Sequence, residues 1–302
     1  MRYITPLRYP GGKARLAPFL AEVVTAQTKE VDLYVEPFAG GAGAALRLLF
    51  DGVVQSAIIN DVNPGIVAFW RSVQSCPRQL CEAIARTPVT IGEWHRQRHI
   101  YNVPGEHDDL ELGFATFFLN RTNRSGILDA GPIGGLKQEG AWTLDARYNK
   151  DALIARVETV AAMKDRLIVR EEDAVDLLSE LRDSGRGTLV YADPPYVKQG
   201  NRLYLHGFTR GLHRGLATEL RRGTYLWLAT YDDHPFVLED LYKEERCARF
   251  GISHTAQNSH VGTETMIFGD NLLVPDDREI TPGAKANSRG RGKHPDVLNG
   301  LA

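Results

Sequence analysis

The chain has 302 residues, of which 43% are hydrophobic and 25% charged, and its formal net charge is −2. These values predict a globular protein with one large domain or two small ones. They exclude a chain that is basic overall, although a local basic face would still allow it to bind nucleic acid.

Five apolar stretches are predicted to be buried strands, and helical patterns separate several of them. The expected strands are residues 31–38, 55–63, 166–173, 187–195 and 225–233. A glycine turn and a helix follow the first strand, and a helix at 64–74 follows the second. This alternation predicts a doubly wound parallel sheet, which binds ligands at the carboxyl ends of its strands.

One interval is too long for a simple crossover between parallel strands. About 90 residues separate the helix that ends near Gln74 from the third strand. We therefore expect an inserted subdomain at residues 75–165, with residues 1–74 and 166–281 forming the catalytic domain. Residues 282–302 are polar, glycine-rich and basic, which predicts a disordered basic tail.

The glycine turn "EPFAGGAGA" is a candidate ligand site. Gly40, Gly41 and Gly43 let the backbone pass close to a ligand and lead into a helix N-terminus. The turn matches neither a phosphate-binding P-loop nor the dinucleotide spacing of glycines. The alternative interpretation is a tight strand-to-helix turn.

Acids that end the second and third strands are further candidates. Asp61 follows the glycines by about 20 residues, where a carboxylate accepts both ribose hydroxyls of an adenosine-containing cofactor such as S-adenosyl-L-methionine. Asp173 ends the third strand and could meet the adenine ring. The alternative for both residues is a cap on the helix that follows.

The segment "VYADPPYV" at residues 190–197 places Asp193 at the end of an apolar strand. Pro194 and Pro195 have fixed φ and no N–H, so the Pro194 carbonyl lies beside the carboxylate in a stiff frame. Two acceptors at one point suit an NH2 group, and Tyr196 offers a ring that stacks on a base. The set is suited to the exocyclic amine of a nucleobase, whereas the alternative is a strand-end turn.

No membrane span, secretion signal or metal site is expected. No apolar run reaches about 18 residues, and the N-terminal stretch lacks the apolar core of a signal peptide. The three cysteines have no CxxC spacing, so the sequence indicates neither a zinc site nor a disulfide framework. We therefore expect a cytoplasmic protein that needs neither a membrane nor a metal.

Five motifs in order resemble those of the Dam-like adenine-N6 DNA methyltransferases. They are "RYPGGK" at residues 8–13, "VEPFAGGAG", "INDVN", "FFLNRTNRSG" at residues 117–126, and "YADPPY". The resemblance covers nearly the whole chain to about residue 275. It implies a Rossmann-like, S-adenosylmethionine-dependent methyltransferase sheet with an inserted, mainly helical target-recognition subdomain.

The resemblance also assigns residues to the cofactor and to catalysis. The catalytic set is Asp193, Pro194, Pro195 and Tyr196. The cofactor set is Tyr9, Gly12, Lys13, Glu36, Phe38, Gly40, Asp61, Asp173 and Asp193. For Lys13 the alternative is a solvated loop lysine.

The expected partner is double-stranded DNA, whose target adenine would be flipped out of the helix. The residues that we expect to contact it are Asn120, Arg121, Asn123 and Arg124. The alternative for the arginines is a solvated basic face. Separately, "NRTNRSGIL" departs from the commoner NR-x-x-FNG wording, so the resemblance does not fix the local DNA contacts or the sequence recognised.

The expected activity is methyl transfer to the N6 amine of adenine in DNA. Other substrates stay open at this point, namely the N4 amine of cytosine in DNA and the N6 amine of adenine in RNA. A catalytically inactive DNA-binding regulator is the non-enzymatic alternative. The sequence does not decide whether a cognate restriction enzyme accompanies the protein.

Overall fold

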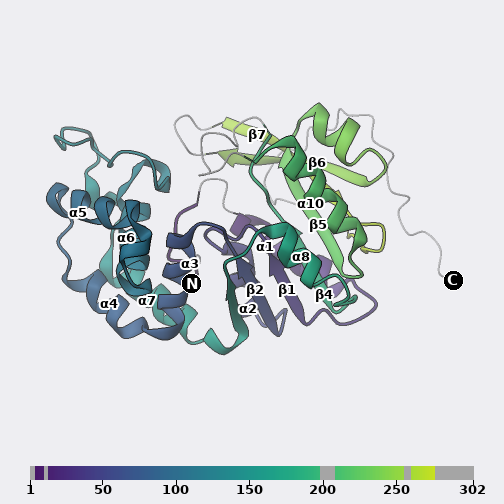
Figure 1. Cartoon of the computed structure of the whole chain (residues 1–302), viewed down its shortest axis with the longest axis horizontal. Helices are drawn as coiled ribbons and strands as arrows, with labels where there is room; N and C mark the ends of the chain where they lie inside the picture. Colours follow the sequence, from purple (N-terminus) through teal and green to yellow (C-terminus); the bar gives the residue numbers. More distant parts are fainter. Residues whose placement is uncertain (1–3, 10–12, 198–207, 255–259, 276–302) are drawn as a thin grey trace.

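The molecule is built on one seven-stranded sheet with a group of helices set to one side of it (Figure 1). The computed structural model describes residues 4–9, 13–197, 208–254 and 260–275. Gly12 and the predicted tail at 282–302 lie outside the described residues, so what we expect of them stays a prediction. The mixed α/β fold predicted from the sequence is confirmed.

The strands are β1 (Leu33–Glu36), β2 (Ser56–Asn60), β3 (Leu167–Arg170), β4 (Thr188–Ala192), β5 (Leu226–Asp232), β6 (Arg246–His254) and β7 (His260–Phe268). The α-helices are α1 (Ala17–Thr25), α2 (Gly43–Phe50), α3 (Pro64–Ser75), α4 (Pro77–Arg86), α5 (Ile91–Asn102), α6 (Asp109–Thr122), α7 (Lys150–Ala161), α8 (Ala174–Glu180) and α10 (Arg210–Arg222). Shorter helical turns used below are η1 (Lys13–Leu16), η3 (Arg124–Gly126), η4 (Leu144–Arg147) and η6 (Phe236–Leu241).

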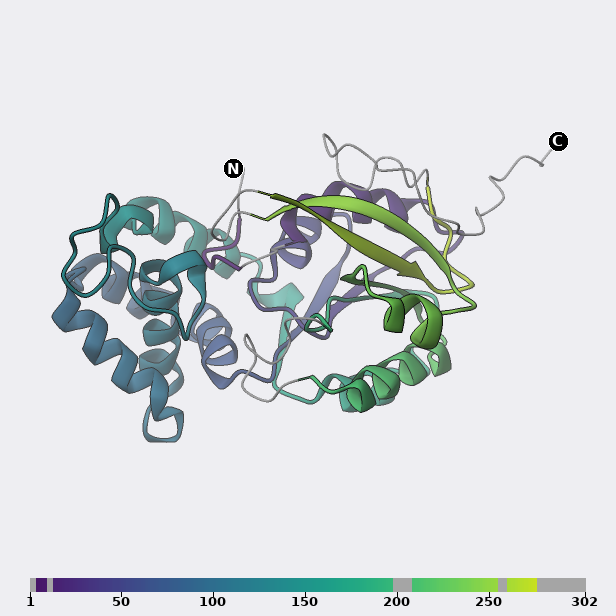
Figure 2. The ribbon, with the colours of Figure 1, turned by 90° about the horizontal axis from the view of Figure 1, so that it is seen from above.

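The five predicted strands are β1 to β5, and they are parallel to one another. The sheet continues beyond them, because β7 pairs antiparallel with β5 and β6 pairs antiparallel with β7. Figure 2 shows this hairpin as a long curved ribbon along one edge of the sheet. The prediction of a wholly parallel sheet is therefore wrong at this edge. A hairpin needs only a short turn, whereas a further parallel strand would need a crossover helix.

The two faces of the sheet bury two separate hydrophobic clusters. Successive strand residues point to opposite faces, so Tyr34 belongs to one cluster and Val35 to the other. The same alternation separates Leu189 from Val190 on β4. Residues of α1, α2 and α3 complete the first cluster, and residues of α8, α10 and η6 complete the second. Both faces are thus covered, as doubly wound sheets require.

The strand order β3-β2-β1-β4-β5-β7-β6 contains a topological switch between β1 and β4. The chain moves outward from β1 to β2 and β3, and then returns to the other side of β1 as β4. Parallel strands on either side of such a switch leave a crevice at their carboxyl ends. In this chain Glu36 ends β1 and Asp193 follows β4 directly.

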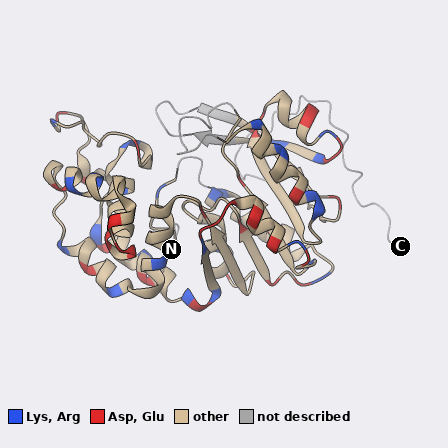
Figure 3. Ribbon diagram, in the orientation of Figure 1, with Lys and Arg blue, Asp and Glu red and all other residues tan. Residues whose placement is uncertain are grey.

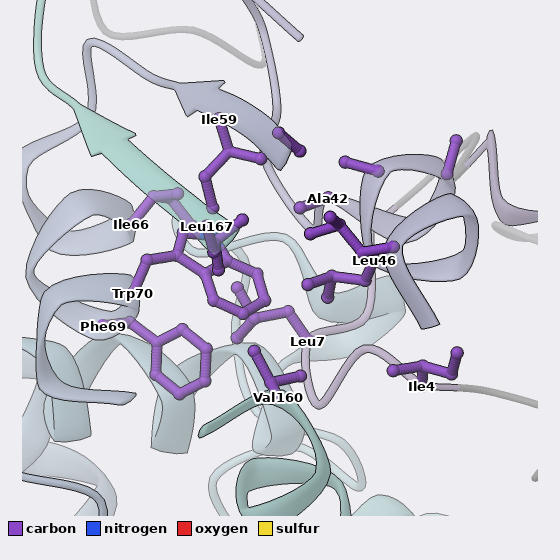
Figure 4. Packing of buried hydrophobic residues seen from close by; sticks show 14 of the residues in the cluster. Ile4, Leu7, Ala42, Leu46, Ile59, Ile66, Phe69, Trp70, Val160 and Leu167 are labelled. Atoms are coloured by element: carbon purple, nitrogen blue, oxygen red, sulfur yellow. The ribbon is translucent and has the colours of Figure 1, made fainter. Parts of the chain in front are cut away.

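The helices between β2 and β3 share the hydrophobic core of the sheet. Helix α6 packs against α3, and a single cluster runs from the strands into α3, α6 and α7. Figure 4 shows part of this cluster, formed by Ile4, Leu7, Ala42, Leu46, Ile59, Ile66, Phe69, Trp70, Val160 and Leu167. The division of the chain at residues 75 and 165 stays a prediction.

Helices of the described part of the chain are too short or too polar to cross a membrane.

The contact between α3 and α6 depends on glycine. A Cβ at Gly113 would lie 2.7 Å from the Ala68 carbonyl oxygen and 2.8 Å from the Phe69 Cα, both of which are backbone atoms. We expect Gly113→Ala to lower the free energy of unfolding by about 1–3 kcal/mol, because the two helices must move apart. Denaturant unfolding measures this change.

The matched control for this substitution is Gly92→Ala in α5. Gly92 is exposed, and a Cβ there would meet no atom within 4 Å. The free energy of unfolding of this variant should rise by up to about 1 kcal/mol, because alanine favours the helix. Equal effects of the two substitutions would contradict close packing of α3 on α6.

Candidate active site

The glycine turn after β1 brings three predicted residues together. Gly40 has φ +46°, and a Cβ there would lie 2.6 Å from the ring of Tyr9. The Gly40 N–H donates to Asp61 Oδ2 at 2.9 Å, while its carbonyl accepts from Trp70 Nε1 at 3.0 Å. Only glycine fits both the left-handed conformation and the close approach of the ring. Tyr9, Gly40 and Asp61 thus lie together at the carboxyl ends of β1 and β2.

Asp61 is half-buried in this turn and does not cap the following helix. Its Oδ1 accepts from the Asn63 N–H at 2.9 Å. Burial raises the pKa of Asp61 to about 6, although its backbone hydrogen bonds act in the opposite direction. Asn63 caps α3 instead, accepting from the N–H groups of Gly65 and Ile66. The cap proposed as the alternative for Asp61 is therefore wrong.

Glu36 links the end of β1 to the start of α2. Its carboxyl is buried, and Oε1 accepts from the Ala45 N–H at 2.9 Å. Burial raises the pKa of Glu36 to about 8, and the hydrogen bond from Ala45 only partly offsets it. Near neutral pH this carboxyl is therefore largely protonated, and a protonated carboxyl is a donor as well as an acceptor.

Two other predicted cofactor residues lie in different surroundings. Asp173 is exposed and caps α8, accepting from the Val175 N–H at 2.8 Å. Phe38 is half-buried, and its ring meets that of Phe208 edge to face at 5.6 Å between centroids. Assignment of Asp173 and Phe38 to the cofactor stays a prediction.

A buried group of charges surrounds Asp193. Lys13 Nζ lies 3.3 Å from Asp193 Oδ1 and 2.8 Å from Glu264 Oε2. The side chain of Lys13 is only 6% exposed, so the interpretation as a solvated loop lysine is wrong. Thr230 Oγ1 donates to Asp193 Oδ1 at 2.6 Å. We call Lys13, Asp193, Tyr196, Thr230 and Glu264 the charge cluster.

The charge cluster keeps its lysine ionised and its aspartate accessible. Burial alone would lower the pKa of Lys13, but Asp193 and Glu264 together hold it above its ordinary value. Burial raises the pKa of Asp193 to about 6, and Lys13 limits this increase. Asp193 keeps 24% exposure of its side chain, whereas Glu264 keeps 1%. Asp193 is therefore the carboxylate of the cluster that a substrate can reach.

Tyr196 joins this cluster through its hydroxyl. Lys13 Nζ donates to the hydroxyl oxygen at 3.0 Å, and the hydroxyl donates to Glu264. The ring centroid lies 5.4 Å from Lys13 Nζ. Pro194 and Pro195 are buried between Asp193 and Tyr196. The hydroxyl thus fixes one end of a ring whose faces are set by the stiff DPPY backbone.

Glu264 and Thr230 were not predicted from the sequence. Thr230 lies inside β5, and Glu264 is opposite Asp232 in the pairing of β5 with β7. A signal for Glu264 was present, because it alternates with Met266 and Phe268 on one face of an apolar strand. A buried carboxylate on such a face needs a partner, which here is Lys13.

The NR-rich segment lies mostly inside the protein. Asn120 is buried and pairs with the backbone of Arg8 through both ends of its amide, at 2.7 and 2.6 Å. Arg121 is buried and donates to the Pro6 carbonyl. Asn123 is buried and accepts from Trp94 Nε1 at 2.7 Å. Arg124 is exposed. Their assignment to DNA stays a prediction, and Arg124 is the member best placed for it.

Comparisons with known proteins identify the family to which this chain is similar. A profile of the family described as "D12 class N6 adenine-specific DNA methyltransferase" matches residues 9–243. A type II methyltransferase of Lactococcus lactis subsp. cremoris is 21% identical over 293 residues, which cover 94% of this chain and 91% of the relative. A type II methyltransferase of Methanocaldococcus jannaschii is 24% identical over 209 residues, which cover 63% of this chain and 68% of the relative. The family match includes Asp193 and ends before Glu264.

The raised pKa of Glu36 predicts a pH dependence of stability. Its pKa is about 8 in the folded protein and 4.5 for an unperturbed glutamate. Between these values the folded state holds a proton that the unfolded chain lacks, so stability falls as the pH rises and levels off above pH 8. We expect a loss of about 2 kcal/mol in the free energy of unfolding between pH 6.5 and 8.

Two variants test this assignment by denaturant unfolding across the same pH range. Glu36→Gln keeps an acceptor for Ala45 but cannot titrate, so its stability should be nearly flat. Asp61→Asn should keep the wild-type dependence of unfolding free energy on pH. The pKa of Asp61 is about 6, so this carboxyl is already mainly ionised throughout the range from pH 6.5 to 8. A wild-type slope in Glu36→Gln would show that another group titrates.

Proposed function

This chain belongs to the D12 class of N6 adenine-specific DNA methyltransferases, and from that premise we propose that S-adenosylmethionine is its methyl donor and the charge cluster its site of transfer. Its reaction is methylation of the N6 amine of adenine in DNA. The observation that carries the proposal is the position of Asp193, which stands at the switch point between β1 and β4, beside the glycine turn. This is the crevice where sheets of this kind bind their ligands.

The glycine turn after β1 and the side chains beside it suit S-adenosylmethionine. The turn at Gly40 leaves no room for a Cβ, and α2 begins three residues later without a side-chain hydrogen bond from its N-cap residue Ala42. Asp61 and Glu36 supply carboxyls of different protonation at the ends of β2 and β1. Tyr9 supplies an aromatic ring. The carboxyl of Asp61 is a partner for the ribose hydroxyls, and that of Glu36 for an amino group. The ring of Tyr9 is a partner for the purine. When bound, S-adenosylmethionine supplies a methyl group activated by its sulfonium.

Asp193 and the Pro194 carbonyl hold the hydrogens of the adenine amine. Above pH 6 the Asp193 carboxylate is mainly ionised and acts as an acceptor. The Thr230 hydroxyl donates a hydrogen bond to Oδ1 and so orients the carboxylate. Two acceptors that bind both N–H groups draw them out of the ring plane and localise the amine lone pair, which makes the amine a better nucleophile. Positioning and electrostatics of this kind can supply most of the rate enhancement.

The target adenine must leave the duplex to reach Asp193, at a cost of a few kcal/mol. Tyr196 offers a ring on which the flipped base stacks, and Arg124 offers an exposed guanidinium for DNA. Because both relatives are described as type II methyltransferases, we extend that role to this chain, with a restriction enzyme of the same recognition sequence as a partner.

The activity is tested by expressing the chain in a host without DNA methylation and digesting the DNA to nucleosides. N6-methyladenine should appear, and sequencing should place it at one recognition sequence. Purified enzyme should transfer tritiated methyl groups from S-adenosylmethionine to unmethylated DNA. Absence of transfer from this donor would contradict the cofactor assignment.

We expect Asp193→Ala to lower methyl transfer by several orders of magnitude while the fold survives, because the residue stands at a strand end. Circular dichroism reports the fold, and tritium incorporation reports the activity. Asp233→Ala is the matched control, since Asp233 also follows a parallel strand and pairs with Arg249 at 3.0 Å. Near-normal transfer by a folded Asp193→Ala variant would eliminate this mechanism.

Tyr196→Ala should lose roughly one to two powers of ten in affinity for the flipped base, because base–aromatic stacking contributes about 1–3 kcal/mol. Tyr196→Phe should keep most of the activity, since the ring remains and Lys13 still pairs with Glu264. Steady-state rates on a duplex with one target site compare the two variants. If Phe proves as damaging as Ala, the hydroxyl and not the ring carries the role.

A further inference from the structure

Four arginines gather around a hollow in the helical part of the molecule. The hollow has a volume of about 420 Å³ and is lined by residues of α6, η4 and α7, among them Arg121, Arg147 and Arg156. Arg8 lies close enough to act electrostatically on both Arg121 and Arg147. We call Arg8, Arg121, Arg147 and Arg156 the arginine cluster.

Among the residues that line the hollow, arginines outnumber carboxylates. Burial lowers the pKa of Arg121 to about 9, and Arg156, Arg8 and Arg147 add to the decrease. Asp145 is the carboxylate that lines the described hollow, and its Oδ1 accepts from Thr143 at 2.6 Å.

Hydrogen-bond donors in the same place lack acceptors. Within the described part of the chain, Arg8 Nη1 and the Tyr148 hydroxyl are buried and have no hydrogen-bond partner. Tyr148 lines the hollow. Buried polar groups of native proteins are nearly always paired, so the Tyr148 hydroxyl points to a ligand in the hollow that accepts hydrogen bonds. A ligand that also relieves the mutual repulsion of arginines is an anion.

We propose that the arginine cluster binds a phosphate of the DNA backbone next to the target site. The inference rests on the proposed function, because it takes DNA as the source of the phosphate. A phosphodiester offers only acceptor oxygens, and guanidinium groups match it in geometry. The hollow is open at Arg147 and Asp145, both of which are exposed, so a long polymer can reach it. Figure 3 shows acidic and basic residues interspersed over both parts of the ribbon, so overall charge does not mark this site.

The N-terminal segment at residues 4–9 connects the arginine cluster to the glycine turn. On one side Arg121 donates to the Pro6 carbonyl, and Arg156 Nη1 donates to the Thr5 carbonyl at 3.3 Å. On the other side Thr5 Oγ1 donates to the Gly41 carbonyl at 2.6 Å. A phosphate held here would therefore be fixed relative to the crevice, which is how backbone contacts set the register of a duplex.

The test compares Arg147→Ala with Arg86→Ala. Arg147 is exposed, so its loss should leave the fold intact, and Arg86 is an exposed arginine of α4 that lies outside the hollow. Duplex DNA with the recognition sequence is titrated by fluorescence anisotropy at several salt concentrations. Arg147→Ala should weaken binding roughly tenfold at low salt, as expected for one charge-assisted contact. The plot of log affinity against log salt concentration should become less steep, with a slope smaller in magnitude by about 0.9.

Arg86→Ala should keep both the affinity and the slope of the wild type. Equal slopes for the wild type and Arg147→Ala, with methyl transfer by the wild type intact, would overturn the phosphate site and leave the proposed function standing. A second measurement compares the melting temperatures of both proteins with and without inorganic phosphate. If it raises the melting temperature of the wild type but not of Arg147→Ala, while the DNA slope stays unchanged, the hollow takes a free anion and the proposal fails. Wild-type enzyme without methyl transfer would instead contradict the proposed function.

Discussion

The arrangement of the crevice depends on one buried ammonium group. Lys13 is held between Asp193, which follows β4, and Glu264 on β7. A buried charge is tolerated only when it is paired, so each of these three elements requires the other two to be in place. Thr230 on β5 and the Tyr196 hydroxyl complete the hydrogen bonds of the group. The position of Asp193 is thus set by Lys13 in η1 and Thr230 on β5, and indirectly by Glu264 on β7, and not by its own turn alone.

The part of this arrangement that lies within single segments was predictable from the sequence. β1 to β5 are short apolar runs that end in acids, and the glycine turn and DPPY lie directly after two of them. The hairpin of β6 and β7 was missed, although Ala248, Phe250 and Ile252 alternate with more polar residues in "RCARFGISH", a pattern typical of a strand with one buried face. Glu264 was missed with it. Its role follows from lying opposite Asp232 across a strand pair, and no local pattern specifies that pairing.

The NR-rich segment shows a second limit of sequence patterns. Its polar residues suggested a surface for DNA, yet Asn120, Arg121 and Asn123 mostly satisfy buried carbonyl and N–H groups. An irregular backbone inside a protein leaves such groups unpaired, and amide side chains can both donate to them and accept from them. Residue type alone does not distinguish a polar side chain that serves the fold from one that faces a ligand. Only burial separates Arg121 from Arg124.

The distance along the chain between the partners of Lys13 bears on how the enzyme is made. Lys13 and Glu264 are 251 positions apart. At synthesis rates of about 5–20 residues per second, the ribosome delivers the second roughly ten to fifty seconds after the first. Until then the nascent chain carries the glycine turn, and later DPPY, without the carboxylate that completes the neutralisation of its lysine. A chain that terminates before β7 would therefore contain most of the family's motifs and still lack an assembled site. The charge cluster is complete only once the last described strand has been made.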